Sequence, residues 1–274
     1  MDHLNSISSD IARGVPNYYG LQRFGVNRPN THVIGKAILK QDFEEAARIF
    51  LGMPGTGEDQ NTKNAREIYM TTQDPRAALQ QIPLYLSLER AILHYLIEHP
   101  GDFKGSFLIF PKTLRSMFVS ATQSYIFNLA LSNRIKEGYS ITEPEIGDTI
   151  LFCDGKSDIV TGSNQKMASI QVKRGRCSIG ICIPGSAPFL GSGLSDEYIR
   201  EIMEKEGITA EMFSHASRYL GVAFDGTIRS ASIKSNIKHT ILDDGYQMDF
   251  CLGPGQYATT ICREFMKSPP ENMI

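Results

Sequence analysis

The stretch Gly14-Val15-Pro16-Asn17-Tyr18-Tyr19-Gly20-Leu21-Gln22-Arg23-Phe24-Gly25 is the most informative part of the sequence. It follows neither the period of a helix nor that of a strand, so a core does not explain its large side chains. Its glycines permit backbone angles closed to other residues and allow a partner to approach the main chain. Aromatic, amide and arginine side chains together stack on unpaired bases and bind their edges and phosphates. The segment therefore predicts a ligand-binding loop; the alternative is an aromatic turn packed beneath another loop.

This stretch resembles the signature of the TruD-type pseudouridine synthases, in which a Pro-Asn-Tyr/Phe-Phe/Tyr-Gly-x-Gln-Arg-Phe-Gly run lies beside the active site. Residues 118–128 are similar to the family's Ala-x-Gln-Ser-x-x-Phe-Asn helix. Residues 255–264 are similar to its C-terminal Gly-x-Tyr/Phe-Ala-Thr-x-x-x-Arg-Glu run. The three segments occur in the family's order, so the chain is identified as a member of this family.

The resemblance implies an isomerase that detaches uracil from its ribose, rotates it and rejoins it through carbon, at position 13 of tRNA. The family uses an aspartate and neither a metal nor an organic cofactor. Enzymes that modify a base flip it out of its stack into a pocket. By resemblance, the pocket here is shaped by Asn17, Tyr18, Gln22, Arg23, Phe24, Tyr257 and Arg263.

The family's catalytic aspartate lies in a Gly-x-Lys-Asp-x-x-Ala loop upstream of the Pro-Asn-Tyr motif, and no Gly-x-Lys-Asp occurs in this sequence. The nearest string, Asp154-Gly155-Lys156, has the wrong order. We therefore expect no catalytic residue in this chain and expect the position of the family's aspartate to lie upstream of Met1. The chain is then the C-terminal part of such an enzyme. A truncation, an internal start, or a split or decayed gene are the alternatives for its origin.

Alone, the chain is expected to be inactive, because the carboxylate that such catalysis needs is missing. A non-catalytic RNA-binding module derived from such an enzyme is the rival interpretation. A decayed product that folds poorly is the third.

Composition is ordinary for a globular protein, with 41% hydrophobic and 21% charged residues in 274. No apolar run reaches the roughly 20 residues that span a bilayer and no signal peptide is recognisable, so we expect a cytoplasmic location. The five cysteines form no Cys-x-x-Cys pair, and no histidine lies at metal-ligand spacing, which favours neither a zinc site nor a disulfide framework. We expect the cysteines to be small buried hydrophobic residues.

A net charge of −2 lacks the overall basic character of many nucleic-acid-binding proteins, so RNA contacts must come from local patches. The expected RNA-binding side chains are Arg28, His32, Lys112, Arg115, Lys173, Arg174 and Lys267. The alternative for such clusters is a solvated face. We expect tRNA as a partner and no association with a membrane. A separate N-terminal catalytic fragment is a second expected partner; otherwise we expect a monomer.

The periodicity of the chain predicts an α+β fold. Apolar residues have helical spacing between residues 42 and 137, and the capping and proline signals there predict helices over 43–51, after Asp74-Pro75, over 84–98 and over 111–136. Beyond these, the pattern predicts strands over 148–153 and 176–183, helices over 195–206 and after Thr209, a hairpin around Asp243-Asp244-Gly245, and a last helix to about Lys267.

The resemblance also predicts how the chain is divided. The family inserts a large α/β domain into its catalytic domain, which maps to residues 27–230. Residues 1–26 and 231–274 are then pieces of a pseudouridine synthase catalytic domain, a mixed or antiparallel sheet with helices. These pieces are expected to meet in space and to leave a cleft for RNA.

Tyr257 is expected in the first turn of the last helix, near Asn17 and Phe24, where free N–H groups favour a phosphate. By resemblance its ring packs against the target uracil; the alternative is that it packs inward with Ile261 and Phe265. Three polar side chains lie on a helix that otherwise belongs to the core, and because such groups need partners we expect them to bond the loops that shape the cleft: Gln123, Ser124 and Asn128.

Overall fold

The computed structural model describes residues 2–187 and 191–267 of the chain. Two expectations fall on positions outside the described residues and stay predictions. One concerns Met1, upstream of which we expect the family's aspartate, and the other concerns residues 268–274 of the expected C-terminal domain piece.

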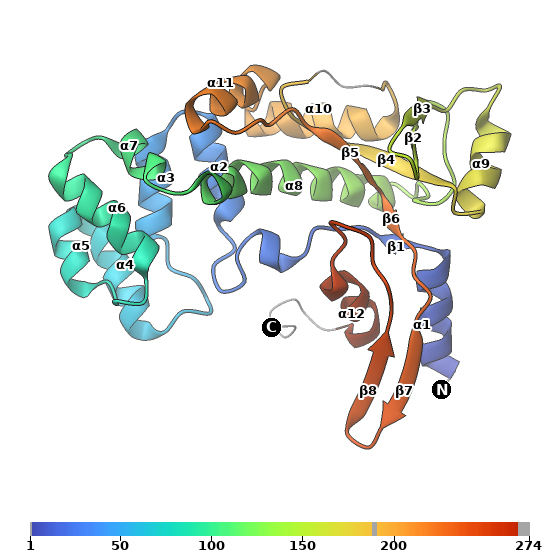
Figure 1. Ribbon diagram of the computed structural model, residues 1–274, viewed down its shortest axis with the longest axis horizontal. Helices are drawn as coiled ribbons and strands as arrows, with labels where there is room; N and C mark the ends of the chain where they lie inside the picture. The colour runs from blue at the N-terminus through green and yellow to red at the C-terminus, as the bar shows by residue number, and fades with distance from the viewer. Residues whose placement is uncertain (1, 188–190, 268–274) are drawn as a thin grey trace.

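The protein is α+β, as its periodicity predicts, and the long helix α8 (Lys112–Lys136) runs through its middle (Figure 1). Helices α2 (Thr31–Leu39) and α10 (Leu194–Glu206) pack against α8. Helix α8 is therefore a central element of the packing.

Residues 27–230 form what we call the large unit. A group of helices lies at one end of it (Figure 1), namely α3 (Phe43–Gly52), α4 (Gln60–Thr72), α5 (Pro75–Gln81), α6 (Ser87–Glu98) and α7 (Phe103–Leu108). Toward the other end, an antiparallel sheet has the order β3-β2-β4-β5, formed by β2 (Thr149–Phe152), β3 (Ser157–Ile159), β4 (Cys177–Ile183) and β5 (Thr227–Ser230). Helices α9 (Gln165–Lys173) and α11 (Ala210–Leu220) complete the unit.

The two ends of the chain, residues 2–26 and 231–267, pack together as what we call the small unit. Its elements are α1 (Asp2–Arg13), β1 (Val15–Pro16), β6 (Ser232–Ile233), β7 (Lys238–Leu242), β8 (Gly245–Asp249) and α12 (Ala258–Met266). Strand β1 pairs with β6, and β7 pairs with β8 in the expected hairpin, both antiparallel. The unit has its own core of Ile7, Ile11, Val15, Ile233, Ile261 and Phe265.

The small unit lies on the opposite side of α8 from α10 and α11 (Figure 1). The chain passes from the sheet of the large unit to the small unit between β5, which ends at Ser230, and β6, which begins at Ser232. The expected division of the chain at this point stays a prediction. The assignment of the small unit to a catalytic domain stays a prediction.

Several element boundaries follow the capping signals in the sequence. Asp42 accepts a hydrogen bond from the Glu45 amide (3.0 Å), and Asp74 accepts one from the Arg76 amide (2.8 Å), as expected for helix caps. The helix expected from residue 84 begins instead at Ser87, because a turn precedes it in which the Leu86 amide donates to the Pro83 carbonyl.

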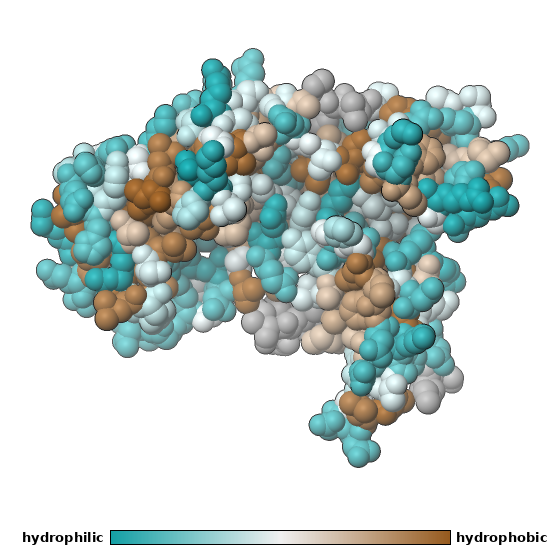
Figure 2. Space-filling model, in the orientation of Figure 1, coloured by the Kyte–Doolittle hydropathy of each residue, from teal (hydrophilic) through white to brown (hydrophobic). Residues whose placement is uncertain are grey.

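The cysteines differ in burial, which corrects one expectation. Cys177 is buried, and burial raises the pKa of the Cys182 thiol to about 12, but Cys153 and Cys251 are exposed because they lie in surface segments beside β2 and β8. Among the described residues, no helix combines the length and the apolar character needed to span a membrane. Figure 2 shows apolar surface on the projecting β7–β8 hairpin, where Ile241 and Leu242 are about half exposed.

Candidate active site

The motif segment, residues 14–25, runs along the junction between the two units. It forms β1 and the short 3-10 turn η1 (Leu21–Arg23), and its remaining residues are irregular, as expected. Gly20 is needed for a close approach: a Cβ atom there would lie 2.7 Å from Thr259 Oγ1 and 3.2 Å from Tyr257 Cδ1. The glycine therefore lets the start of α12 lie directly against the motif segment.

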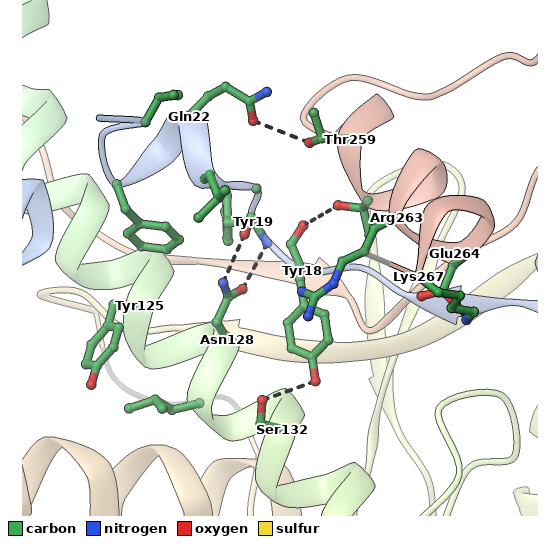
Figure 3. A pocket seen from close by; sticks show the side chains of 16 residues that line it. Tyr18, Tyr19, Gln22, Tyr125, Asn128, Ser132, Thr259, Arg263, Glu264 and Lys267 are labelled. Atoms are coloured by element: carbon green, nitrogen blue, oxygen red, sulfur yellow. Dashed lines mark hydrogen bonds and ion pairs between the residues drawn. The ribbon is translucent and has the colours of Figure 1, made fainter. Parts of the chain in front are cut away.

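Polar side chains of helix α8 hold neighbouring loops, and Asn128 bonds the backbone of the motif segment (Figure 3). Asn128 Oδ1 accepts from the Tyr19 amide (2.9 Å), and Asn128 Nδ2 donates to the Tyr19 carbonyl (3.1 Å). Arg23 Nε donates to Ser124 Oγ (3.0 Å), and Gln123 Nε2 donates to the Pro184 carbonyl (2.7 Å). The prediction that the polar residues of this helix bond neighbouring loops is confirmed.

Helix α12 contacts the motif segment from the other side. The Thr259 hydroxyl donates to Gln22 Oε1 (3.3 Å), and the Thr260 hydroxyl donates to the Tyr18 carbonyl (3.2 Å), across 237 and 242 residues of sequence (Figure 3). The first and last motifs of the chain are therefore neighbours in space, as the resemblance implies.

Tyr257 lies beside the motif segment rather than in the core of the small unit. Its ring meets the Tyr19 ring edge-on, with centroids 5.8 Å apart, and burial raises the pKa of its half-buried hydroxyl. Ile261 and Phe265, by contrast, are buried in that core. One detail is corrected: Tyr257 has extended backbone (φ −110°) and precedes α12 as its N-cap, so it is not in the first turn.

Arg229, at the end of the large unit's sheet, joins both motifs and was not expected from the sequence. Its Nη2 donates to Asn17 Oδ1 (2.7 Å), and its Nη1 donates to the Gly255 carbonyl (2.7 Å). Its guanidinium lies 4.0 Å from the centroid of the Tyr19 ring, a cation–π contact. Asn17 itself is buried, and its Nδ2 donates to the Ser230 carbonyl (2.8 Å).

We call these five side chains the arginine–tyrosine cluster: Asn17, Tyr19, Arg23, Arg229 and Tyr257. Its two arginines bind only uncharged groups within the described part of the chain, where neither lies within 4.0 Å of a carboxylate oxygen. Arg229 is half buried, and this burial lowers the pKa of its guanidinium. Half-buried cations with neutral partners favour an anion beside them.

A cavity of about 770 Å³ lies next to the cluster, between one face of α8 and one face of α12 (Figure 3). It falls within the range of about 300–1,000 Å³ that is typical of ligand pockets. The expected site residues among its lining are Tyr18, Gln22, Phe24, Arg263 and Lys267. The Tyr18 hydroxyl and Ser132 Oγ are hydrogen-bonded (3.1 Å) in its wall. Further lining residues that were not in the expected set include Tyr125, Leu129, Thr259 and Glu264.

Arg28 is not a phosphate-binding residue in this structure, contrary to expectation. Its side chain is 12% exposed, contacts Glu58 and Glu89, and donates to the Phe50 carbonyl (2.6 Å). Burial lowers its pKa to about 10. The guanidinium is therefore committed to an internal network, because two carboxylates and a carbonyl already compensate it.

The other expected RNA-binding residues lie at three places. His32 stacks on Tyr125 (4.5 Å) and meets Phe24 edge-on (5.4 Å), so it supports the cavity wall. Lys112 is exposed and Arg115 half-buried at the start of α8. Lys173 and Arg174 line a second cavity of about 550 Å³ with Arg13 and Lys234, and Lys173 pairs with Glu143 (3.1 Å). RNA contact by these residues stays a prediction.

A family model described as tRNA pseudouridine synthase D (TruD) matches residues 1–265. A protein described as "Probable tRNA pseudouridine synthase D" from Methanosarcina barkeri is 34% identical over 274 residues, which cover 95% of this chain and 62% of that protein. A protein with the same description from Thermococcus gammatolerans is 36% identical over 262 residues, which cover 93% of this chain and 62% of that protein.

The crystal structure of a TruD protein from Methanosarcina mazei is similar to this fold with a TM-score of 0.89 and 34% identity. The similarity covers 99% of this chain and 65% of that one. The sequence thus spans less than two thirds of the length of each of these relatives.

Proposed function

This chain belongs to the TruD family of tRNA pseudouridine synthases, and from that premise we propose that its arginine–tyrosine cluster forms one wall of the pocket in which uridine 13 of tRNA is isomerised. The observation that carries the proposal is the convergence of Asn17, Tyr19 and Tyr257 around Arg229 at the junction of the two units. A flipped pyrimidine needs an aromatic face to stack on and polar groups at its edge.

Each side chain of the cluster has a role in this proposal. Tyr257 and Tyr19 supply the stacking faces, since both rings are only half buried. Arg229 fixes the relative positions of the two motifs through Asn17 and Gly255. Arg23 and Arg229 together supply positive charge for a neighbouring anion, either the catalytic carboxylate of the family or an RNA phosphate.

We propose that the chain alone makes no pseudouridine, because its sequence contains no Gly-x-Lys-Asp loop. A polypeptide equivalent to the remaining part of a relative is the proposed partner. Its docking surface is the small unit, where a two-stranded pair and an isolated hairpin leave strand edges open among the described residues. The exposed Ile241 and Leu242 belong to this surface.

The test compares tRNA treated with the purified chain alone and with the chain plus the separately produced N-terminal part of the Methanosarcina barkeri relative. We expect no pseudouridine from either polypeptide alone and turnover from the mixture. Ile241→Asp with Leu242→Asp should weaken the restoration, whereas Met167→Asp, an exposed apolar residue on α9, should not. Turnover by the chain alone would contradict the proposal.

An RNA-binding module without catalysis is the second candidate function. It is favoured by the combination of a complete aromatic and arginine cluster with the missing Gly-x-Lys-Asp loop. It predicts tRNA binding by the chain alone and no pseudouridine from the mixture, so the same experiment separates the two functions.

A further inference from the structure

The 770 Å³ cavity and the arginine–tyrosine cluster are different places. The cavity shares only Tyr19 with the cluster, because its lining does not include Asn17, Arg23, Arg229 or Tyr257. Tyr18 and Tyr19 are consecutive in the sequence, but their side chains make different contacts. The Tyr19 ring contacts Tyr257 and Arg229, whereas the Tyr18 hydroxyl bonds Ser132 in the cavity wall.

Two helix faces line the cavity together with residues from the segment 18–26. Tyr125, Asn128 and Ser132 recur at spacings of three and four residues on α8, and on α12 Arg263 and Glu264 follow Thr260 by three and four residues. Figure 3 shows Tyr125 and Tyr18 to either side of Asn128, with Arg263 close to Tyr18. Two aromatic rings and a guanidinium therefore line the same opening.

The polar groups at this cavity differ in whether they are already bonded. Asn128 uses both ends of its amide on the Tyr19 backbone. Glu264 is bound by Lys267 (2.7 Å), so it does not compensate Arg263. Within the described residues, the Arg263 guanidinium and the Tyr125 hydroxyl have no hydrogen-bonding or ionic partner. The cavity thus presents a stacking surface with an uncompensated cation at its rim.

We propose that this cavity binds a second unpaired nucleotide of the RNA, next to the reacting uridine, with its base against Tyr125 and its phosphate at Arg263. The inference rests on the proposed function, because it takes the cluster as the uridine site. Aromatic faces beside a free guanidinium are the chemistry that binds single-stranded nucleotides. The Tyr19 backbone, held by Asn128, separates the two bases.

The test uses nuclear magnetic resonance titrations of the purified chain with uridine 5′-monophosphate and with a uridine-centred RNA trinucleotide. Tyr125→Ala should lower the affinity for the trinucleotide by roughly 5- to 150-fold, the effect of losing one stacked base, and should leave the affinity for the mononucleotide unchanged. Tyr125→Phe should retain the wild-type affinities. Tyr139→Ala, which removes a 40% exposed ring three residues beyond the last residue of α8, is the matched control.

Arg263→Ala tests the phosphate contact without altering a buried residue. It should lower the slope of log affinity against log salt for the trinucleotide by about 0.7, whereas Arg76→Ala on α5 should leave it unchanged. The inference is overturned if Tyr125→Ala weakens both ligands equally or weakens neither.

Tyr257→Ala reports on the proposed function in the same titrations, because it should weaken both ligands. If it weakens neither while Tyr125→Ala weakens only the trinucleotide, the cluster is not the uridine site and the cavity still binds a nucleotide. Thermal unfolding of each variant shows whether it remains folded.

Discussion

The guanidinium of Arg229 lies 4.0 Å from the centroid of the Tyr19 ring and binds Asn17 and Gly255 at the same time. Arg229 comes from the sheet of the large unit, while its partners come from the two ends of the chain. One side chain therefore fixes the geometry of both motifs, and this explains how segments so distant in sequence keep a constant arrangement.

Arg229→Ala should destabilise the protein by about 1.5–3 kcal/mol, because it removes charge-assisted hydrogen bonds and leaves the buried Asn17 oxygen without its donor. Arg229→Lys should recover only part of this, since an ammonium cannot reproduce the planar fork. Urea unfolding measures both values. Arg76→Ala, an exposed arginine on α5, should change stability by less than about 0.5 kcal/mol. An Arg229→Ala value equal to that control would refute the role.

Asn128→Ala should loosen the motif segment, because the Tyr19 amide and carbonyl lose their partners. Leaving such groups unbonded costs about 1–3 kcal/mol. Hydrogen exchange should show faster exchange at Tyr19 and its neighbours, with little change in β4. Asn133→Ala, on the last turns of the same helix, is the control; uniform acceleration in both variants would point to global destabilisation instead.

Lys173→Ala with Arg174→Ala should weaken tRNA binding if the second cavity contacts phosphates. Each lost contact should lower the slope of log affinity against log salt by roughly 0.7–0.9. Filter binding over a salt series measures the slope. An unchanged affinity and slope would show that these residues, one of which pairs with Glu143, form only a solvated face.

The stability of the protein should fall as the pH drops below about 6.5, because burial lowers the pKa of His32, with Lys36 adding to the effect and Glu206 opposing it. Below that pH the unfolded chain binds a proton that the folded chain resists, so the free energy of unfolding rises with pH in this window. His32→Gln should reduce the dependence, and the exposed His94→Gln should not. Unfolding midpoints at pH 5, 6 and 7 that vary equally in all three proteins would contradict this.

Much of the fold could be predicted from the sequence because its signals are local. The caps at Asp42 and Asp74, the long apolar stripe of α8 and the Asp243-Asp244-Gly245 turn each specify an element by themselves. Helix α1 was not predicted, although Leu4, Ile7 and Ile11 have helical spacing, because its remaining residues are polar and its partner is the distant α12.

The candidate site could be predicted only as far as its motifs reach. Asn17, Gln22 and Tyr257 stand in recognisable runs, but Arg229 lies in a four-residue strand without a motif, and its bond to Asn17 spans 212 residues. Arg28 shows the reverse error. Its charge suggested phosphate binding, whereas its burial depends on Glu58 and Glu89, which only the tertiary structure brings to it.

The most direct test of the central claim measures pseudouridine formation on tRNA by the chain combined with the N-terminal part of a relative, for wild type, Tyr257→Phe and Tyr257→Ala. If the arginine–tyrosine cluster holds the uridine, Tyr257→Phe keeps most of the rate of pseudouridine formation. Tyr257→Ala lowers that rate by about 5- to 150-fold, which corresponds to the free energy of stacking one base. All three proteins should unfold at similar temperatures. An equal rate for Tyr257→Ala and wild type would show that the cluster is not the uridine pocket.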